Sequence, residues 1–214
     1  LEQANLPIGV VTHIAAPASL KVEYQGAGGH AGAVLMPERR DALLPAAELT
    51  LAVRRAAEEI GGVDTVATTG VLQVHPGAVN SIPSRTQLEI DIRDIDHARR
   101  DRVLDQVRAD AQKIGDRHRQ ETHIELVNAD PPATCAAMVV DAVEAAADDS
   151  GLAYQRMISR AYHDSLFMAQ VAPTGMIFIP CRDGVSHRPD EYATPEALAA
   201  GVSVLAGVLR RLAE

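Results

Sequence analysis

The stretch QLEIDIR, residues 87–93, alternates polar and apolar side chains without interruption. Successive side chains of a β-strand point to opposite faces of a sheet, so this period of two predicts a strand with one face in the core and one in solvent. One covered face and one solvated face are typical of an antiparallel sheet. We therefore expect residues 87–93 to lie in an antiparallel sheet that helices cover on one side.

The segments on both sides of this strand supply the helices and the remaining strands. Residues 41–60 are rich in alanine and leucine and are followed by two glycines, which is typical of a helix and its C-terminal stop. In order, the expected elements are a strand at 20–24, a helix at 41–60, strands at 63–74 and 87–93, a helix at 96–117 and a strand at 122–127. This β-α-β-β-α-β order predicts a ferredoxin-like domain, in which an antiparallel sheet carries two helices on one face.

A different pattern flanks this domain. The expected elements are a strand at 8–15 and then, after Pro132, a helix at 135–150, a strand at 154–158, a helix at 163–171, a strand at 174–179 and a last helix capped by Thr194. The last helix carries an apolar stripe of Leu198, Val202, Leu205, Leu209 and Leu212. Helices that alternate with strands in this way predict the tail of a parallel α/β sheet.

Two strands are too few for a parallel sheet that is covered on both faces. The predicted architecture is therefore α/β, with a ferredoxin-like domain of residues 19–131 inserted in an incomplete parallel-sheet domain of residues 1–18 and 132–214. We expect the chain to be the C-terminal part of a two-domain protein.

The composition argues against several classes of partner. The formal net charge of -9 disfavours nucleic acid or an anionic membrane as the main partner, although local basic groups can still hold a small anion. The two cysteines, Cys135 and Cys181, form neither a disulfide framework nor a zinc-ribbon spacing, which fits a reducing compartment. No apolar run is long enough to span a membrane, so no transmembrane helix is expected.

Two histidines follow the predicted strands of the C-terminal part. His187 lies in a glycine-containing loop after the strand at 174–179, and a neutral imidazole in such a loop suits Zn²⁺ or Mn²⁺. On spacing alone, a histidine that hydrogen-bonds within its own loop is the stronger interpretation. His163 and Asp164 are either an acid/base or ligand-contacting pair, or the start of a helix with Asp164 near the positive end of the helix dipole.

Three further polar residues lie in the small domain. His30 projects from a loop with four glycines, residues 26–32, where a ligand can approach the backbone closely, or it is incidental to a surface loop. The guanidinium of Arg93 can hold a carboxylate through two hydrogen bonds, or it pairs with a neighbouring aspartate. Asn80 either binds a ligand or caps the turn before it. The sequence contains no G-x-S-x-G motif that would indicate a serine nucleophile.

Five motifs occur in order along nearly the whole chain: GHAG at 29–32, MPERRDA at 36–42, NSIP at 80–83, DIRD at 91–94 and DGVSHRPDE at 183–191. Together they resemble the amidohydrolase branch of the M20 metallopeptidase family. This branch includes N-carbamoyl-L-amino acid hydrolases, β-ureidopropionases, allantoate amidohydrolases and ureidoglycolate amidohydrolases. Residues 75–84 and 158–169 are most similar to the last group. Most of the branch has Ser-Gly-Ala before the His-Asp pair, and Arg160 and Tyr162 depart from that pattern toward the ureidoglycolate group.

The resemblance implies a two-domain hydrolase with two divalent metal ions, Mn²⁺ or Zn²⁺, in the larger domain. It also implies that the ferredoxin-like domain is a lid through which the protein forms a homodimer. His187 matches the last metal ligand of the family. The other ligands and the glutamate general base belong to motifs that the family places before Leu1, so we expect the gene product to begin upstream of this residue.

The same resemblance implies roles for the other candidate residues. His30, Asn80, Arg93 and His163 match positions that hold the carboxylate and the carbonyl oxygen of the substrate. His30 is expected to act in catalysis and to reach the site of the neighbouring subunit. We expect the hydroxyl of Tyr162 to recognise the 2-hydroxyl of the substrate, since a site that hydrogen-bonds a hydroxyl rejects the deoxy analogue strongly.

The expected function of the parent protein is metal-dependent hydrolysis of a small anionic ureido acid, namely ureidoglycolate, to glyoxylate with release of ammonia and carbon dioxide. Such a reaction recovers nitrogen from purine rings. The alternatives are an allantoate or N-carbamoyl-L-amino acid amidohydrolase, and a non-catalytic dimerisation and substrate-docking fragment. The chain by itself is expected to be inactive, and a cytoplasmic location is expected if the source is bacterial.

Overall fold

The computed structural model of the protein describes residues 1–213, and the chain divides into two compact units. We call Ala16–Pro131 the inserted unit, and Leu1–Ala15 together with the chain from Pro132 onwards the flanking unit. The first junction lies at Ala15/Ala16 rather than after residue 18. The physical reason is that the first strand of the inserted unit already pairs with its neighbour at Ala16, opposite Asp94.

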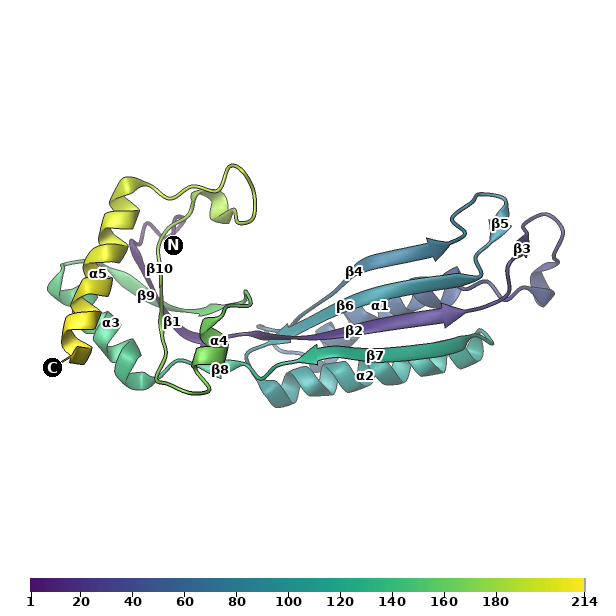
Figure 1. The fold of residues 1–214 in the computed structure, drawn as a ribbon, viewed down its shortest axis with the longest axis horizontal. Coiled ribbons are helices and arrows are strands. Elements are labelled where there is room, and N and C mark those ends of the chain that lie inside the picture. Colours follow the sequence, from purple (N-terminus) through teal and green to yellow (C-terminus); the bar gives the residue numbers. More distant parts are fainter. Residues whose placement is uncertain (214) are drawn as a thin grey trace. The chain divides into compact units, whose positions relative to one another are not determined.

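The inserted unit is built around one four-stranded antiparallel sheet. Its elements are β2 (Ala16–Gln25), α1 (Leu43–Ile60), β4 (Val66–His75), β6 (Arg85–Asp94), α2 (His97–Arg117) and β7 (Glu121–Ala129). The strand order is β4-β6-β2-β7, and both helices lie on the same face of the sheet (Figure 1). The predicted ferredoxin-like fold is confirmed.

The end of this sheet at which β2 finishes carries a small tip. The short strands β3 (Gly29–His30) and β5 (Ser81–Ile82) pair with each other there, and a 3₁₀ turn, η1 (Met36–Glu38), follows β3. The tip therefore brings together two loops that are about fifty residues apart in the sequence.

The alternation in residues 87–93 sorts the side chains as predicted. Leu88, Ile90 and Ile92 are fully buried in the core between the sheet and the two helices, where Leu49 of α1 and Val107 of α2 meet them. Burying one such side chain contributes roughly 1.5–3 kcal/mol to the stability of the fold. The polar residues of the same stretch lie on the open face of the sheet.

A buried carboxylate lies at the end of this sheet that is opposite to the tip, which we call the base. Asp94, the last residue of β6, is 0% exposed. It accepts hydrogen bonds from Arg99 Nε at 2.8 Å, from the backbone N–H of Asp96 at 2.8 Å and from the hydroxyl of Thr65. Asp96 in turn caps α2 by accepting from the backbone N–H of Arg99 at 2.9 Å. These bonds fasten the start of α2 to the end of β6.

The flanking unit contains a mixed sheet, so the prediction of a parallel sheet is wrong in this respect. Its elements are β1 (Ile8–Ile14), β8 (Ala133–Thr134), α3 (Ala137–Asp149), β9 (Tyr154–Ser159), α4 (Ser165–Met168), β10 (Met176–Phe178), the 3₁₀ turn η2 (Arg182–Gly184) and α5 (Pro195–Ala213). Strand β1 pairs parallel with β9 but antiparallel with β10 and β8. The direction of β9 and β10 relative to β1 depends on pairing between segments that lie far apart in the sequence. Local sequence patterns therefore do not predict it.

The two helices after β9 also differ from the prediction. The helix expected at residues 163–171 is only the single turn α4. In α5, Thr194 caps the helix as predicted, since its hydroxyl oxygen accepts from the backbone N–H of Ala197 at 3.1 Å. The residues of the predicted apolar stripe, however, are exposed and line an open hollow of about 590 Å³ together with residues of α3 and β10. The buried side chains of α5 include the smaller residues Val204 and Val208, and α5 packs against α3. Among the described residues, 1–213, none of the helices has the length and apolarity that crossing a membrane requires.

Candidate functional site

The flanking unit contains a cavity of about 770 Å³ beside the end of β9. Its polar lining includes Ser159, His163, Asp183, Ser186 and Glu191, and its apolar lining includes Phe178 of β10. Both predicted loops, the one after β9 and the one after β10, therefore contribute to one hollow. This hollow has the size and the polar groups to accept a small polar ligand.

His163 lines this cavity and its ring is held on two sides. Ring nitrogen Nε2 lies 2.7 Å from the hydroxyl oxygen of Ser159, and the ring of Phe178 lies at a centroid distance of 6.0 Å. Asp164 occupies the position before α4, but its side chain makes no capping hydrogen bond. His163 thus lies beside the cavity with its ring next to Ser159, and its role as a ligand contact stays a prediction.

His187 lies in the loop between Ser186 and Glu191, which both line the cavity. Its backbone has a φ of 59°, and its N–H donates to the carboxylate of Glu191 at 2.9 Å. The side chain is exposed. Within residues 1–213, no three histidine, cysteine, aspartate or glutamate side chains converge as a metal site would require. An accessible imidazole is a suitable ligand for Zn²⁺ or Mn²⁺, and the role of His187 as a metal ligand stays a prediction.

Tyr162 lies between two residues that line the cavity, Ala161 and His163. Its ring makes an edge-on contact with Phe167, with 5.7 Å between the centroids, and the residue is 41% exposed. The aromatic contact is made by the ring and not by the hydroxyl. The hydroxyl can therefore be removed without disturbing that contact.

His30 and Asn80 lie together at the tip of the inserted unit. His30 in β3 pairs with Ser81 in β5, and the backbone N–H of Ala31 donates to the carbonyl oxygen of Asn80 at 2.8 Å. The N–H of Gly32 donates to Nδ1 of the His30 ring at 3.1 Å. Since Nδ1 accepts this bond, Nε2 carries the ring proton of the neutral imidazole and is the nitrogen that can donate to a ligand.

Arg93 lies at the base of the sheet and not at the tip. Its Nε and Nη2 atoms donate to the two carboxylate oxygens of Asp91 at 2.7 and 2.9 Å, and these bonds raise the pKa of the guanidinium above its ordinary value. Along β6, Arg85 at the tip end lies eight residue steps from Arg93. At about 3.3 Å per step, the distance is roughly 25 Å, so Arg93 cannot share a small ligand with His30 and Asn80 of the same copy.

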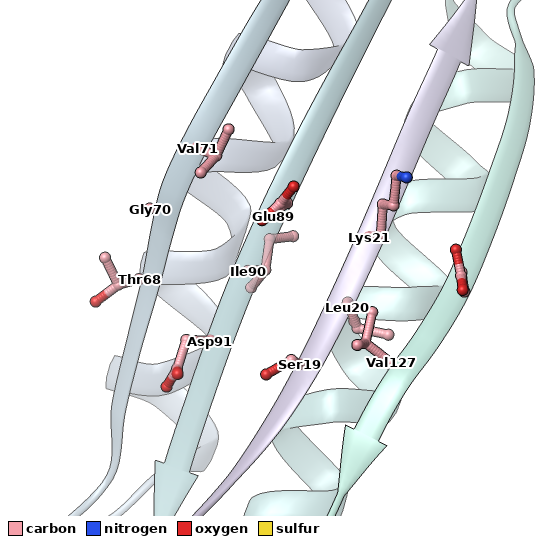
Figure 2. Close-up of a pocket in the computed structure, with 11 residues that line it drawn as sticks. Ser19, Leu20, Lys21, Thr68, Gly70, Val71, Glu89, Ile90, Asp91 and Val127 are labelled. Atoms are coloured by element: carbon pink, nitrogen blue, oxygen red, sulfur yellow. The ribbon is translucent and has the colours of Figure 1, made fainter. Parts of the chain in front are cut away.

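The open face of the sheet carries a second hollow, of about 580 Å³. Figure 2 shows that Lys21, Glu89 and Asp91 stand on this face, with the helices behind the sheet. Lys21 faces Glu89 on one neighbouring strand and Glu125 on the other. This hollow lies on the solvated face of the sheet that the alternation predicts. On this face, charges of both signs lie opposite each other on neighbouring strands.

Comparison with known protein families shows to which family the chain belongs. A model described as peptidase family M20/M25/M40 matches residues 10–211. The chain belongs to this family. The motif-based resemblance is thereby confirmed at the level of the family.

The M20 chain is also similar to individual proteins and to a solved structure. A protein of Oryza sativa subsp. japonica named ureidoglycolate hydrolase is 56% identical over 99% of this chain and 44% of its own length. An N-carbamoyl-L-amino acid amidohydrolase of Geobacillus stearothermophilus is 36% identical over 100% of this chain and 52% of its own length. A crystal structure of "AtUAH in complex with glyoxylate" superimposes with a TM-score of 0.93 at 54% identity, over 99% of this chain and 50% of that one. The M20 chain thus spans about half the length of the relatives it matches.

One residue of the cavity was not singled out from the sequence. Ser159 ends β9, is 1% exposed and contacts His163. Serine occurs at the ends of many strands, so its residue type carries no signal there. Its spacing of four residues before His163 would have pointed to a contact only on a helix, and the backbone here leaves a strand.

Proposed function

We propose that the full-length protein of which this M20 chain is a part hydrolyses ureidoglycolate to glyoxylate, with release of ammonia and carbon dioxide. The observation that carries this proposal is the 56% identity with the rice ureidoglycolate hydrolase across 99% of the chain. The similarity to a structure that holds glyoxylate supports it. The amidohydrolase of Geobacillus, at 36% identity, makes N-carbamoyl-L-amino acids the second candidate substrates.

We infer that His187 is one ligand of a pair of divalent metal ions, Zn²⁺ or Mn²⁺, whose other ligands lie outside this chain. When bound, these ions supply an activated water and polarise the ureido carbonyl. His163 is positioned by Ser159 and lines the cavity beside the His187 loop, so it is the donor that we assign to the carbonyl oxygen. Arg93 is assigned to the carboxylate of the substrate, which its guanidinium can hold through two hydrogen bonds.

We further propose that the protein acts as a homodimer in which His30 and Asn80 serve the site of the other copy, His30 as a catalytic donor. The distance of roughly 25 Å along β6 between the tip and Arg93 supports this arrangement, since one copy cannot apply all three residues to one small substrate. With two copies, the tip of one can meet the site to which the other contributes Arg93.

The substrate assignment is tested on the full-length protein loaded with Zn²⁺ or Mn²⁺. We expect ammonia and glyoxylate to appear when ureidoglycolate is supplied, and the activity to disappear after treatment with a chelator. N-carbamoyl-L-amino acids and allantoate are assayed in parallel. A higher kcat/KM for either of these would contradict the assignment.

Replacing Tyr162 with phenylalanine tests whether its hydroxyl recognises the 2-hydroxyl of the substrate. Tyr162→Phe keeps the ring that contacts Phe167 and removes only the hydroxyl. We expect the ratio of kcat/KM for ureidoglycolate to that for a deoxy ureido acid to fall about 10- to 100-fold, the effect of losing one hydrogen bond in a site built for it. An unchanged ratio would show that another group recognises the 2-hydroxyl.

A further inference from the structure

Ser159 is a buried serine whose hydroxyl contacts the histidine of the cavity. The residue is 1% exposed, and its Oγ lies 2.7 Å from Nε2 of His163. Its backbone is anchored as well, because its carbonyl oxygen accepts from the N–H of Ala15 at 2.8 Å at the point where β9 pairs with β1. The hydroxyl is therefore a fixed partner for the ring.

The hydrogen bonds around this hydroxyl bear on the tautomer of His163. A serine hydroxyl has one proton to donate and two lone pairs. The N–H of Ala161 donates to Oγ at 3.3 Å, and the proton of Oγ can go to His163 Nε2 at 2.7 Å or to the carbonyl oxygen of Ala161 at 3.5 Å. If Oγ donates to Nε2, then Nδ1 carries the proton of the neutral imidazole. If instead Nε2–H donates to Oγ, the hydroxyl proton is left with the carbonyl oxygen of Ala161 at 3.5 Å. The first arrangement gives the hydroxyl proton the nearer acceptor, so it is the one on which we build.

The same hydroxyl also suits the protonated ring. In the imidazolium both nitrogens carry protons, and Nε2–H then donates to Ser159 Oγ. The hydroxyl proton turns to the carbonyl oxygen of Ala161, which is the remaining acceptor. With Oγ donating to the neutral ring, Nδ1 is an N–H donor in both protonation states of the ring.

We propose that Ser159 is a positioning residue that keeps Nδ1 of His163 as a hydrogen-bond donor to the carbonyl oxygen of the substrate. This inference rests on the proposed function, which assigns His163 to that oxygen. An N–H fixed before the reaction stabilises the negative charge that develops on the oxygen, without the cost of reorienting the ring.

The tautomer itself is tested by nitrogen NMR of the full-length protein labelled with ¹⁵N-histidine. The signal of His163 is identified by its loss in His163→Gln. We expect the neutral ring to be protonated at Nδ1 and to accept at Nε2. A ring protonated mainly at Nε2 would overturn the proposal, and this measurement depends neither on activity nor on the stability of a variant.

Kinetics of two Ser159 variants test the consequence. We expect Ser159→Ala to lower kcat on ureidoglycolate about 10- to 100-fold with KM within about twofold, because the donor is lost from the transition state rather than from binding. The Nδ1–H tautomer should also lose its dominance. Ser159→Thr keeps a hydroxyl and should recover most of the rate.

The matched control is Ser150→Ala, which removes a hydroxyl that donates to the carbonyl oxygen of Ala146 at 2.8 Å, at the end of α3. It should leave kcat unchanged. A folded Ser159→Ala protein with wild-type kcat and an unchanged tautomer would overturn the proposal. If the wild-type protein fails to hydrolyse ureidoglycolate and yet shows the Ser159-dependent Nδ1–H tautomer, the substrate assignment fails and the positioning of the ring stands.

Discussion

His187→Gly in the full-length protein should lower the bound metal content and reduce hydrolysis of ureidoglycolate by at least about a thousandfold. The reason is that a bound metal ion stabilises the transition state by several kcal/mol, and that stabilisation is lost with its ligand. Glycine is the replacement of choice because the backbone at position 187 has a φ of 59°, which glycine adopts without strain. Metal analysis and an ammonia-release assay measure the two effects.

The same variant allows a rescue experiment. Free imidazole added to His187→Gly should enter the vacated volume and restore part of both metal content and activity, since the side chain is exposed. His123→Ala, which removes an exposed histidine of β7 that pairs with Glu121, is the matched control and should retain both. Normal metal content in His187→Gly would show that His187 is not a ligand.

Asp94→Ala should destabilise the inserted unit by about 3–5 kcal/mol, the usual cost of leaving the partner of a buried carboxylate without its charge. The change removes the acceptor of Arg99, Thr65 and the N–H of Asp96 at once. Since whole domains are stable by only about 5–15 kcal/mol, this is a large fraction of the total. Hydrogen exchange of the amides in β6 and α2 of the full-length protein measures the loss where it occurs.

Glu58→Gln is the control for Asp94→Ala. It breaks an ion pair with Arg54 on the exposed face of α1, and such solvent-exposed pairs contribute little to stability. Equal hydrogen exchange in the two variants would show that Asp94 contributes no more to the stability of the inserted unit than the exposed ion pair does.

The same carboxylate makes the inserted unit sensitive to acid. Burial by itself raises the pKa of Asp94, but the hydrogen bonds from Arg99, Thr65 and the N–H of Asp96 more than offset this, so the net pKa lies below its ordinary value. The unfolded chain therefore binds the proton more readily than the folded one, and stability falls as the pH drops from the ordinary aspartate range through the lowered pKa. Asp94→Asn should flatten this dependence, as followed by unfolding between neutral and acidic pH.

The sequence predicted those residues of the candidate site that belong to short local motifs. The GHAG and NSIP motifs were recognised in the sequence, and the structure places His30 and Asn80 of these motifs side by side through the pairing of β3 with β5. Arg93 was predicted for the same ligand, but the length of β6 separates it from the tip. No sign of the contact between Ser159 Oγ and His163 Nε2 was visible in the sequence, because it depends on how the chain turns after β9.

The sequence by itself determined the long strands and helices of this protein and the buried face of the strand at residues 87–93. Periodicity and helix caps act between residues that are close along the chain, so local patterns record them. Only the tertiary structure decided the antiparallel direction of β10, the exposure of the apolar stripe on α5 and the contact between Ser159 and His163. Each of these depends on a partner, whether β1, α3 or a hydroxyl, that the fold brings into contact.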